Sequence, residues 1–190
     1  MTVKDIRNHF EKLQEALCTV SEEMSDDILL SCRTIGDALK QGNRILIMGN
    51  GGSAADAQHF AAELVGRFLL ERKALPAIAL TTDSSILTAV GNDYGFDEIF
   101  KRQVEALAQS GDVVIGVSTS GLSNNVFHAL TAANKIGCKT IGLLGRDGGN
   151  IAGIVDVDLT VPVQHTPYIQ GTHGAIIHII CDLVEKELFG

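Results

Sequence analysis

His59 and Glu63 stand four residues apart in the stretch GNGGSAADAQHFAAELVGRF, which runs from Gly49 to Phe68. If this stretch is helical behind its glycine turn, the i, i+4 spacing lets the imidazole and the carboxylate point at one spot. The His-Glu-x-x-His zinc motif would need a second His on the same face, and the stretch has none. A lone His/Glu pair on a helix is more often a solvated surface pair, and the spacing alone favours that interpretation.

The final stretch of the chain, YIQGTHGAIIHIICDLVEKELF, changes this interpretation of the His/Glu pair. It places Gln170, His173 and His178 among apolar residues, and Pro167 just before it suits an early position of a helix. A histidine in such surroundings is usually a hydrogen-bonded core residue. If this helix crosses near the glycine turn, however, it completes a mixed nitrogen and oxygen site that suits zinc or another divalent ion. The members of that site would be His59, Glu63, Gln170 and His178.

Two loops have the composition of anion-binding loops. GNGGSA follows RILIM and offers close backbone approach at Gly49, Gly51 and Gly52, with the Ser53 hydroxyl at the start of a helix. STSGLSNN follows DVVIGV and offers hydroxyl groups around Gly121 before another helix. These hydroxyls belong to Ser118, Thr119, Ser120 and Ser123. One such loop is usually structural, but two at the same sheet edge favour phosphate binding.

Other phosphate-binding classes are less well supported. No Gly-Lys-Ser/Thr follows either loop, which makes a nucleoside triphosphatase unsupported. Gly49, Gly51 and Ala54 satisfy the dinucleotide pattern G-x-G-x-x-A, yet Asp83 comes late for the acid that would hold the ribose, so a nicotinamide enzyme is a weak alternative. Asn92 and Asp93 are expected in a polar turn between helical segments, either as an Asx cap or as contacts to sugar hydroxyls.

Elements that would position these residues follow from the hydrophobic pattern. Apolar residues recur at helical spacing from about Val3 to Lys40, which predicts one bent helix or two successive helices. From residue 44 onward, short apolar runs alternate with helix-like stretches, which is typical of a parallel sheet covered on both faces. The five predicted strands are 44–49, 77–80, 112–117, 139–145 and 157–163. We therefore predict an α/β fold, a three-layer αβα sandwich with a five-stranded parallel sheet and a helical N-terminal arm.

Composition limits the class of protein. With 190 residues, 45% of them apolar, and no low-complexity linker, we expect a single domain over 1–190, with 1–40 as the arm. The net charge of -8 argues against nucleic acid and anionic membranes as partners. The four cysteines are scattered, and no segment has the length of a signal peptide or a membrane span, so we expect a cytoplasmic protein with reduced thiols.

Nearly the whole chain resembles the sedoheptulose 7-phosphate isomerases (phosphoheptose isomerases) of the sugar isomerase domain superfamily. The shared motifs are GNGGSAADAQHFAAEL, AIALTTD, GNDYGF, QVEALAQSGDVVIGVSTSG, DGG at 147–149 and the pattern from Gln170 to His178. The resemblance implies a flavodoxin-like sandwich, one zinc ion per subunit, and a homotetramer whose active sites lie at subunit interfaces. It implies conversion of sedoheptulose 7-phosphate to D-glycero-D-manno-heptose 7-phosphate through an enediol(ate), the first step of heptose synthesis for bacterial lipopolysaccharide and other surface glycans.

The resemblance also implies roles for individual residues. Glu63 and His178 match the acid/base pair of the family, without deciding which of the two takes the C1 proton. The zinc ligands of the family are matched by His59, Glu63, Gln170 and His178. Its sugar-phosphate contacts are matched by Asn50, Gly51, Gly52, Ser53, Glu63, Asn92, Asp93, Ser118, Thr119, Ser120, Ser123 and Gln170.

The chain departs from the family pattern beside Gln170. Tyr168 and Gly171 stand where the family usually has Arg and Glu, which bears on metal affinity and substrate preference. Two other classes stay open. A non-catalytic relative is a tetrameric adaptor for the bacterial replication initiator, but it lacks counterparts of Glu63 and His178. A sugar-phosphate sensor would use the two loops for binding alone.

Overall fold

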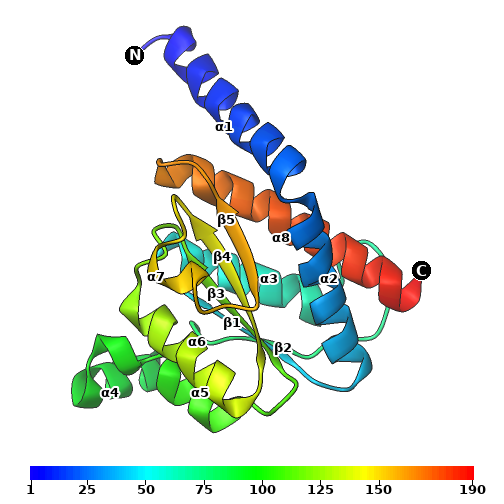
Figure 1. Ribbon diagram of the computed structural model, residues 1–190, viewed down its shortest axis with the longest axis vertical. Helices are drawn as coiled ribbons and strands as arrows, with labels where there is room; N and C mark the ends of the chain where they lie inside the picture. Colours follow the sequence, from blue (N-terminus) through cyan, green and yellow to red (C-terminus); the bar gives the residue numbers. More distant parts are fainter.

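A five-stranded parallel sheet forms the centre of the protein, as the computed structural model of all 190 residues shows (Figure 1). Its order is β2-β1-β3-β4-β5, and every neighbouring pair of strands is parallel. The strands are β1 (Ile45–Gly49), β2 (Ala77–Ala79), β3 (Val113–Ser118), β4 (Lys139–Gly145) and β5 (Val157–Val161). The predicted parallel sheet is confirmed, although β2 and β5 end earlier than the sequence pattern indicated.

Eight α-helices and one short 3-10 helix accompany the strands. They are α1 (Val3–Glu23), α2 (Ser25–Lys40), α3 (Gly52–Val65), α4 (Ser84–Tyr94), η1 (Phe96–Glu98), α5 (Lys101–Leu107), α6 (Asn124–Ile136), α7 (Gly149–Ala152) and α8 (Thr166–Phe189). Gly137 ends α6 in the left-handed conformation, and Pro167 lies in the first turn of α8. Both residues hold the positions that the sequence predicted for them.

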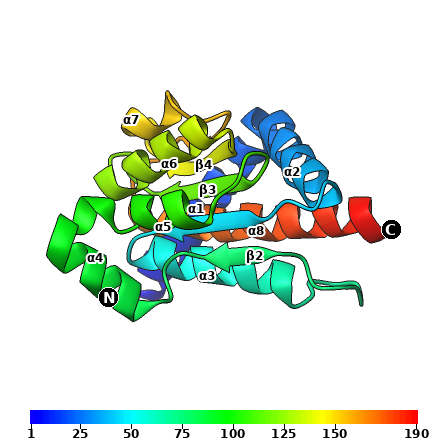
Figure 2. The ribbon, with the colours of Figure 1, turned by 90° about the horizontal axis from the view of Figure 1, so that it is seen from below.

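Helices cover both faces of the sheet and give the fold two apolar cores. Ile45 and Ile47 face a core shared with α2, α3 and α8, whereas Leu46 and Met48 face a core shared with α5 and α6. Successive strand residues point to opposite faces, so a strand buried on both sides reads as one continuous apolar run. Figure 2 shows the layers from a second direction, with α3 and α8 on one side of the sheet and α6 on the other. The predicted αβα sandwich is confirmed.

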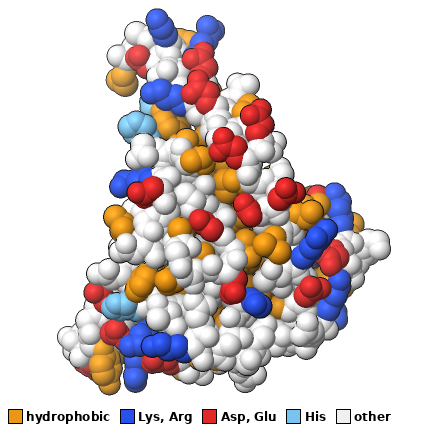
Figure 3. Space-filling view, in the orientation of Figure 1, with side chains coloured by type: hydrophobic (Ala, Val, Ile, Leu, Met, Phe, Trp, Pro, Cys, Tyr) orange, Lys and Arg blue, Asp and Glu red, His pale blue; other side chains and the backbone are white.

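The N-terminal arm consists of two helices that meet at Met24. Of the two arrangements that the sequence allowed, two successive helices is therefore correct. Most of α1 projects beyond the body of the protein (Figure 1). Its apolar residues Ile6 and Phe10 are exposed, and orange apolar side chains gather where the arm joins the body in Figure 3. No helix of the protein is both long and apolar enough to cross a membrane.

The two residues of α8 that depart from the family pattern both contact the arm. The Tyr168 hydroxyl lies 2.7 Å from Nδ1 of His9, and a Cβ on Gly171 would lie 2.9 Å from Cδ1 of Leu13. Gly171 therefore lets the side chain of Leu13 approach the backbone of α8. In this chain the two positions join α8 to the arm.

Gly121, in the loop after β3, is required for a close backbone approach. Its φ is +66°, and a Cβ there would overlap the carbonyl group of Gly148. The Gly121 carbonyl also accepts a hydrogen bond from the N–H of Ile151 at 3.2 Å. The loop after β3 is thus fixed against the loop after β4 through backbone atoms.

We predict that Gly121→Ala destabilises the protein more than Gly42→Ala. Both glycines have a positive φ, but a Cβ at Gly42 would meet nothing within 4 Å. Gly42→Ala should lower the free energy of unfolding by about 1 kcal/mol, the cost of a left-handed residue with a side chain. Gly121→Ala should cost at least about 2 kcal/mol more, because backbone atoms must move. Urea unfolding of both variants at one protein concentration measures this, and equal losses would contradict it.

Candidate active site

The two candidate binding loops lie where the helices that follow neighbouring strands cover opposite faces of the sheet. β1 and β3 are neighbours, but β1 leads into α3 on one face and β3 leads into α6 on the other. In open parallel sheets a crevice forms at such a point, beyond the carboxyl ends of the strands. The two loops that the sequence indicated for anion binding are the loops after β1 and β3, and they therefore lie next to each other at the carboxyl edge of the sheet.

The loop after β1 brings its backbone against α8. Gly51 has a φ of +56°, and a Cβ on Gly52 would overlap the side-chain amide of Gln170. The glycine at position 52 thus lets Gln170 reach the first turn of α3. Ser53 lies at the start of this helix, as the sequence indicated, and is buried in its first turn. Gly51 occupies the capping position.

The loop after β3 gathers hydroxyl groups. Oγ of Ser118 lies 3.0 Å from Oγ of Ser123, and Oγ of Ser120 accepts a hydrogen bond from the N–H of Leu122 at 3.2 Å. Thr119 is half-buried between them. Ser118 and Ser123 therefore hold the two ends of the loop together in front of α6.

A pair of asparagines joins the two loops. Asn50 and Asn125 exchange two side-chain hydrogen bonds of 2.9 Å, and Asn125 is 2% exposed. Oδ1 of Asn125 also accepts from the N–H of Val126. Asn50 was predicted as a site residue from the sequence, but Asn125 was not, because a second Asn at a helix start resembles ordinary capping. The bonds fix the distance between the two loops.

His59, Glu63 and His178 converge where α3 and α8 pack against each other. Nε2 of His59 lies 3.1 Å from Oε1 of Glu63 and 3.2 Å from Nε2 of His178. One potential ligand atom from each residue lies within 4.8 Å of those of the other two, an arrangement that could hold a metal ion. All three come from one chain, with α3 supplying His59 and Glu63 and α8 supplying His178. The crossing of the last helix that the sequence analysis required is present.

One atom of His59 contacts both partners. Its Nε2 carries at most one hydrogen, so it can donate fully to only one of Glu63 and His178. Asp56 lies one turn before His59 on α3, and its Oδ2 is buried without a hydrogen-bond partner. Burial raises the pKa of Asp56, and the nearby His59 opposes this rise. The sequence analysis did not single out Asp56.

His173, the remaining histidine of the last helix, belongs to the core. It is fully buried, and its Nε2 lies 2.7 Å from the carbonyl oxygen of Leu144, to which it donates. Burial lowers the pKa of His173 to about 4, although the bond to Leu144 opposes this shift. Within one helix, therefore, His173 is the core histidine and His178 the exposed one in the cluster.

Asn92 and Asp93 are not among the residues brought together. They were expected in a turn, but they lie in the last turn of α4 and are exposed, with Nδ2 of Asn92 donating to Oδ1 of Asp93 at 2.8 Å. The turn prediction was wrong because Asp83 caps α4 and the helix continues to Tyr94. This use of Asp83 also removes the acid that a dinucleotide site would need near a ribose.

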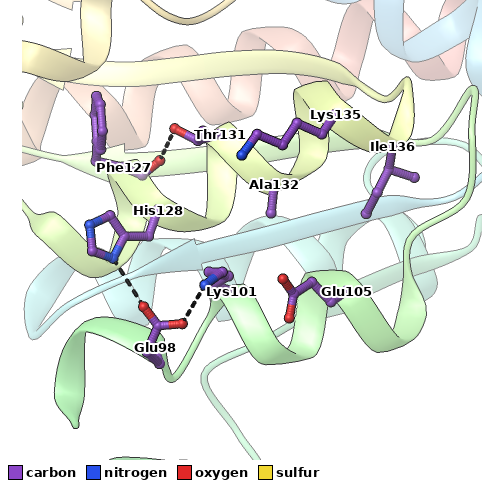
Figure 4. A pocket seen from close by; sticks show the side chains of 9 residues that line it. All are labelled: Glu98, Lys101, Glu105, Phe127, His128, Thr131, Ala132, Lys135 and Ile136. Carbon is purple, nitrogen blue, oxygen red and sulfur yellow. Dashed lines mark hydrogen bonds and ion pairs between the residues drawn. The ribbon is translucent and has the colours of Figure 1, made fainter. Parts of the chain in front are cut away.

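A separate hollow lies between α5 and α6 (Figure 4). It measures about 340 Å³, and none of the residues singled out from the sequence lines it. Its carboxylate at Glu98 is paired with Lys101 at 2.7 Å and with Nδ1 of His128 at 3.3 Å. The charge of Glu98 is therefore compensated within the protein, and the hollow is not the candidate active site.

Comparison with known proteins agrees with this arrangement. Residues 8–145 match the SIS domain family model. A phosphoheptose isomerase from Syntrophotalea carbinolica is 70% identical over 189 residues, which cover 100% of this chain and 96% of the relative. The solved phosphoheptose isomerase from Neisseria gonorrhoeae has a TM-score of 0.92 and 43% identity, covering 97% of this chain and 100% of that one. The one from Francisella tularensis has a TM-score of 0.94 and 36% identity, with 98% and 100% covered.

We predict that His173 makes the protein less stable in acid. Its pKa of about 4 in the folded state lies below the ordinary 6.5, so folding favours the neutral ring. Its contribution to stability is complete above pH 6.5 and is lost as the pH falls toward 4, by about 3 kcal/mol. His173→Gln should flatten the pH dependence of the free energy of unfolding in this range, whereas the exposed His165→Gln should not. An unchanged slope in His173→Gln would refute the assignment.

Proposed function

The chain belongs to the SIS domain family and, within it, to the phosphoheptose isomerases, and we propose that its crevice catalyses the aldose–ketose isomerisation of sedoheptulose 7-phosphate. The chain is an isomerase of heptose biosynthesis, as its relatives are. The product is D-glycero-D-manno-heptose 7-phosphate, which feeds the synthesis of bacterial surface glycans. The observation that carries the proposal is the convergence of His59, Glu63 and His178 from the two helices α3 and α8.

Glu63 and His178 are the proposed proton-transfer groups. The isomerisation moves a proton between C1 and C2 through an enediol(ate), which needs a base for the C–H and an acid or relay for the oxygens. Glu63 and His178 each lie next to His59, so the two can face one substrate from different helices. Either residue can take the C1 proton in this arrangement. His59 orients the carboxylate of Glu63 by a contact of 3.1 Å.

The same cluster is suited to zinc. Two imidazoles and one carboxylate match the nitrogen and oxygen donors that zinc binds, and the family resemblance adds the amide of Gln170, which reaches the first turn of α3. We propose His59, Glu63, Gln170 and His178 as ligands of one zinc ion per subunit. When bound, zinc supplies a positive charge that polarises the substrate oxygens and stabilises developing negative charge. A carboxylate that binds metal is a weaker base, so Glu63 serves one of its two roles at a time.

The two loops are proposed to bind the rest of the substrate. Backbone N–H groups at a helix start attract phosphate, and α3 and α6 both begin at the crevice. We assign the phosphate to the loop after β3, with Ser118, Thr119, Ser120 and Ser123, far from the reacting carbons. The sugar is assigned to Asn50, Gly51, Gly52, Ser53 and Gln170. Because Asn92 and Asp93 are exposed on α4, we assign them to the sugar bound by a neighbouring subunit.

A homotetramer is proposed as the working form. The exposed Ile6, Phe10 and Leu17 on α1 and the exposed Ile179 and Leu183 on α8 provide apolar surface for packing against other chains.

The four free cysteines fit a reducing cytoplasm. We infer no nucleic-acid or membrane partner, given the net charge of -8.

Two non-catalytic functions fit the residues less well. An adaptor protein has no need for Glu63 and His178, and a sugar-phosphate sensor has no need for a cluster of side chains that suits a metal ion. Relatives that cover the full chain carry the name phosphoheptose isomerase, which also favours the enzyme.

We expect Glu63→Gln to lower the rate of isomerisation by at least about 10²-fold, because a general base contributes at least this much. The amide keeps the shape of the side chain but cannot accept a proton. Conversion of sedoheptulose 7-phosphate to the aldose, followed by NMR, measures the rate. The matched control is Glu71→Gln, since Glu71 is exposed and pairs only with Arg67 at 3.6 Å. A Glu63→Gln enzyme with most of its activity would remove Glu63 from the mechanism.

Light scattering after size exclusion should give a mass of about four times the 20.2 kDa of one chain. Phe10→Glu should reduce this mass, because it places a charge on the exposed apolar side of α1. Lys4→Glu should not reduce it, because Lys4 is already an exposed, charged residue. A wild-type protein that elutes as a monomer and still isomerises the sugar would contradict the tetramer.

A further inference from the structure

We propose that Phe68 is a positioning residue for His178, and that the buried ion pair between Arg72 and Glu185 holds Phe68 in place. The inference rests on the proposed function, because it concerns the same site. It assigns a role to three residues in and beside the loop between α3 and β2 that the sequence analysis did not single out.

The ring of Phe68 packs against the imidazole of His178. The ring centroids are 5.4 Å apart and the planes are inclined by 29°, which is a stacked arrangement. His59 meets the same imidazole edge-on, with centroids 4.9 Å apart and planes at 87°. His178 is otherwise exposed, and its side-chain hydrogen bond is the one through Nε2 to His59. Since rotation about the last side-chain bond of a histidine is only weakly restricted, the stacked ring limits which way Nε2 points.

Glu185 fixes the backbone of the segment that carries Phe68. Its two carboxylate oxygens accept from the N–H groups of Phe68 at 3.1 Å, Leu69 at 2.7 Å and Leu70 at 2.7 Å. Burial raises the pKa of Glu185, but these N–H groups and Arg72 outweigh burial and lower it. Glu185 comes two helical turns after His178 on α8, so one rigid helix sets the position of both.

Arg72 connects the same loop to α3. It donates to Glu185 at 2.9 Å, and its side chain is 2% exposed. Its guanidinium also donates to the carbonyl oxygens of Glu63 and Leu64, both at 2.8 Å. The ion pair thus joins the backbone at Glu63, on the helix that carries His59, to the helix that carries His178. The loop that carries Phe68 is therefore held against both helices.

The experiment compares wild type, Phe68→Leu, Phe68→Tyr and the control Leu69→Ala. Leu69 is the next residue in the loop, and its side chain is 63% exposed. Zinc affinity is measured by competition with a chromophoric chelator, and kcat and KM are measured with sedoheptulose 7-phosphate. We expect about 10-fold weaker zinc binding and a lower kcat for Phe68→Leu, as for other outer partners of metal ligands. Phe68→Tyr, which keeps the ring, and Leu69→Ala should stay within about twofold of wild type.

A readout without metal separates this inference from the proposed function. Stacking on Phe68 shifts the NMR signals of the His178 ring protons in the metal-free protein, and we expect Phe68→Leu to remove that shift and Phe68→Tyr to keep it. If wild type neither binds zinc nor isomerises the sugar, the proposed function fails, and the NMR comparison still decides the inference. Equal zinc affinity in wild type and Phe68→Leu, or equal losses in Phe68→Leu and Phe68→Tyr, would overturn it.

Glu185→Gln tests the second half of the proposal. We expect it to weaken zinc binding as Phe68→Leu does. The double variant Phe68→Leu/Glu185→Gln should lose no more zinc affinity than either single variant, because both substitutions act through the ring at position 68. Additive losses in the double variant would show that the ion pair acts on the cluster by another route. If Glu185→Gln does not fold, the same comparison is made with Arg72→Lys, which keeps the charge but loses the bonds to the α3 carbonyl oxygens.

Discussion

The close approach of α8 to α3 is the constraint on which the site depends. His59 and Glu63 are neighbours on one helix and would remain a surface pair without a third group. Because α8 crosses beside α3, His178 comes within 3.2 Å of His59 although 119 residues separate them in the chain. The absence of a side chain at Gly52 lets Gln170 of α8 reach the first turn of α3. The core histidine His173 and the apolar residues around it pack α8 against the sheet. The exposed face of the helix, which carries His178, therefore has a fixed position relative to the sheet.

The parallel sheet supplies the other half of the arrangement. Because β1 and β3 are adjacent and their helices lie on opposite faces, the loops that end them share one crevice, and the paired amides of Asn50 and Asn125 fix the loops relative to each other. The apolar cores on both faces make these strands rigid supports. In the proposed function, the phosphate of the substrate lies at the hydroxyl groups of the loop after β3 and its carbonyl group at the His/Glu cluster.

Much of this arrangement could be predicted from the sequence. Uniformly apolar strands, helix-like stretches between them and glycines at their ends predicted the sheet, and the polar residues within an apolar final helix predicted the cluster. Local sequence patterns did not predict the role of a residue where that role depends on a contact partner far away in the chain. Asn125 resembles a helix cap until Asn50 is placed opposite it, and Arg72 and Glu185 resemble surface charges until the loop folds over α8. Asn92 and Asp93 resembled a turn because their polarity is that of loops, whereas Asp83 starts a helix that runs through them.

Zinc dependence is measured by titrating zinc into the metal-free protein and recording isomerisation of sedoheptulose 7-phosphate at each step. Chelation should abolish turnover, and activity should return in proportion to added zinc until one ion per chain is bound. The protein in which both His59 and His178 are replaced by alanine should neither bind the ion tightly nor regain activity. Full activity in the chelated wild-type protein, or tight zinc binding that leaves it inactive, would contradict the account.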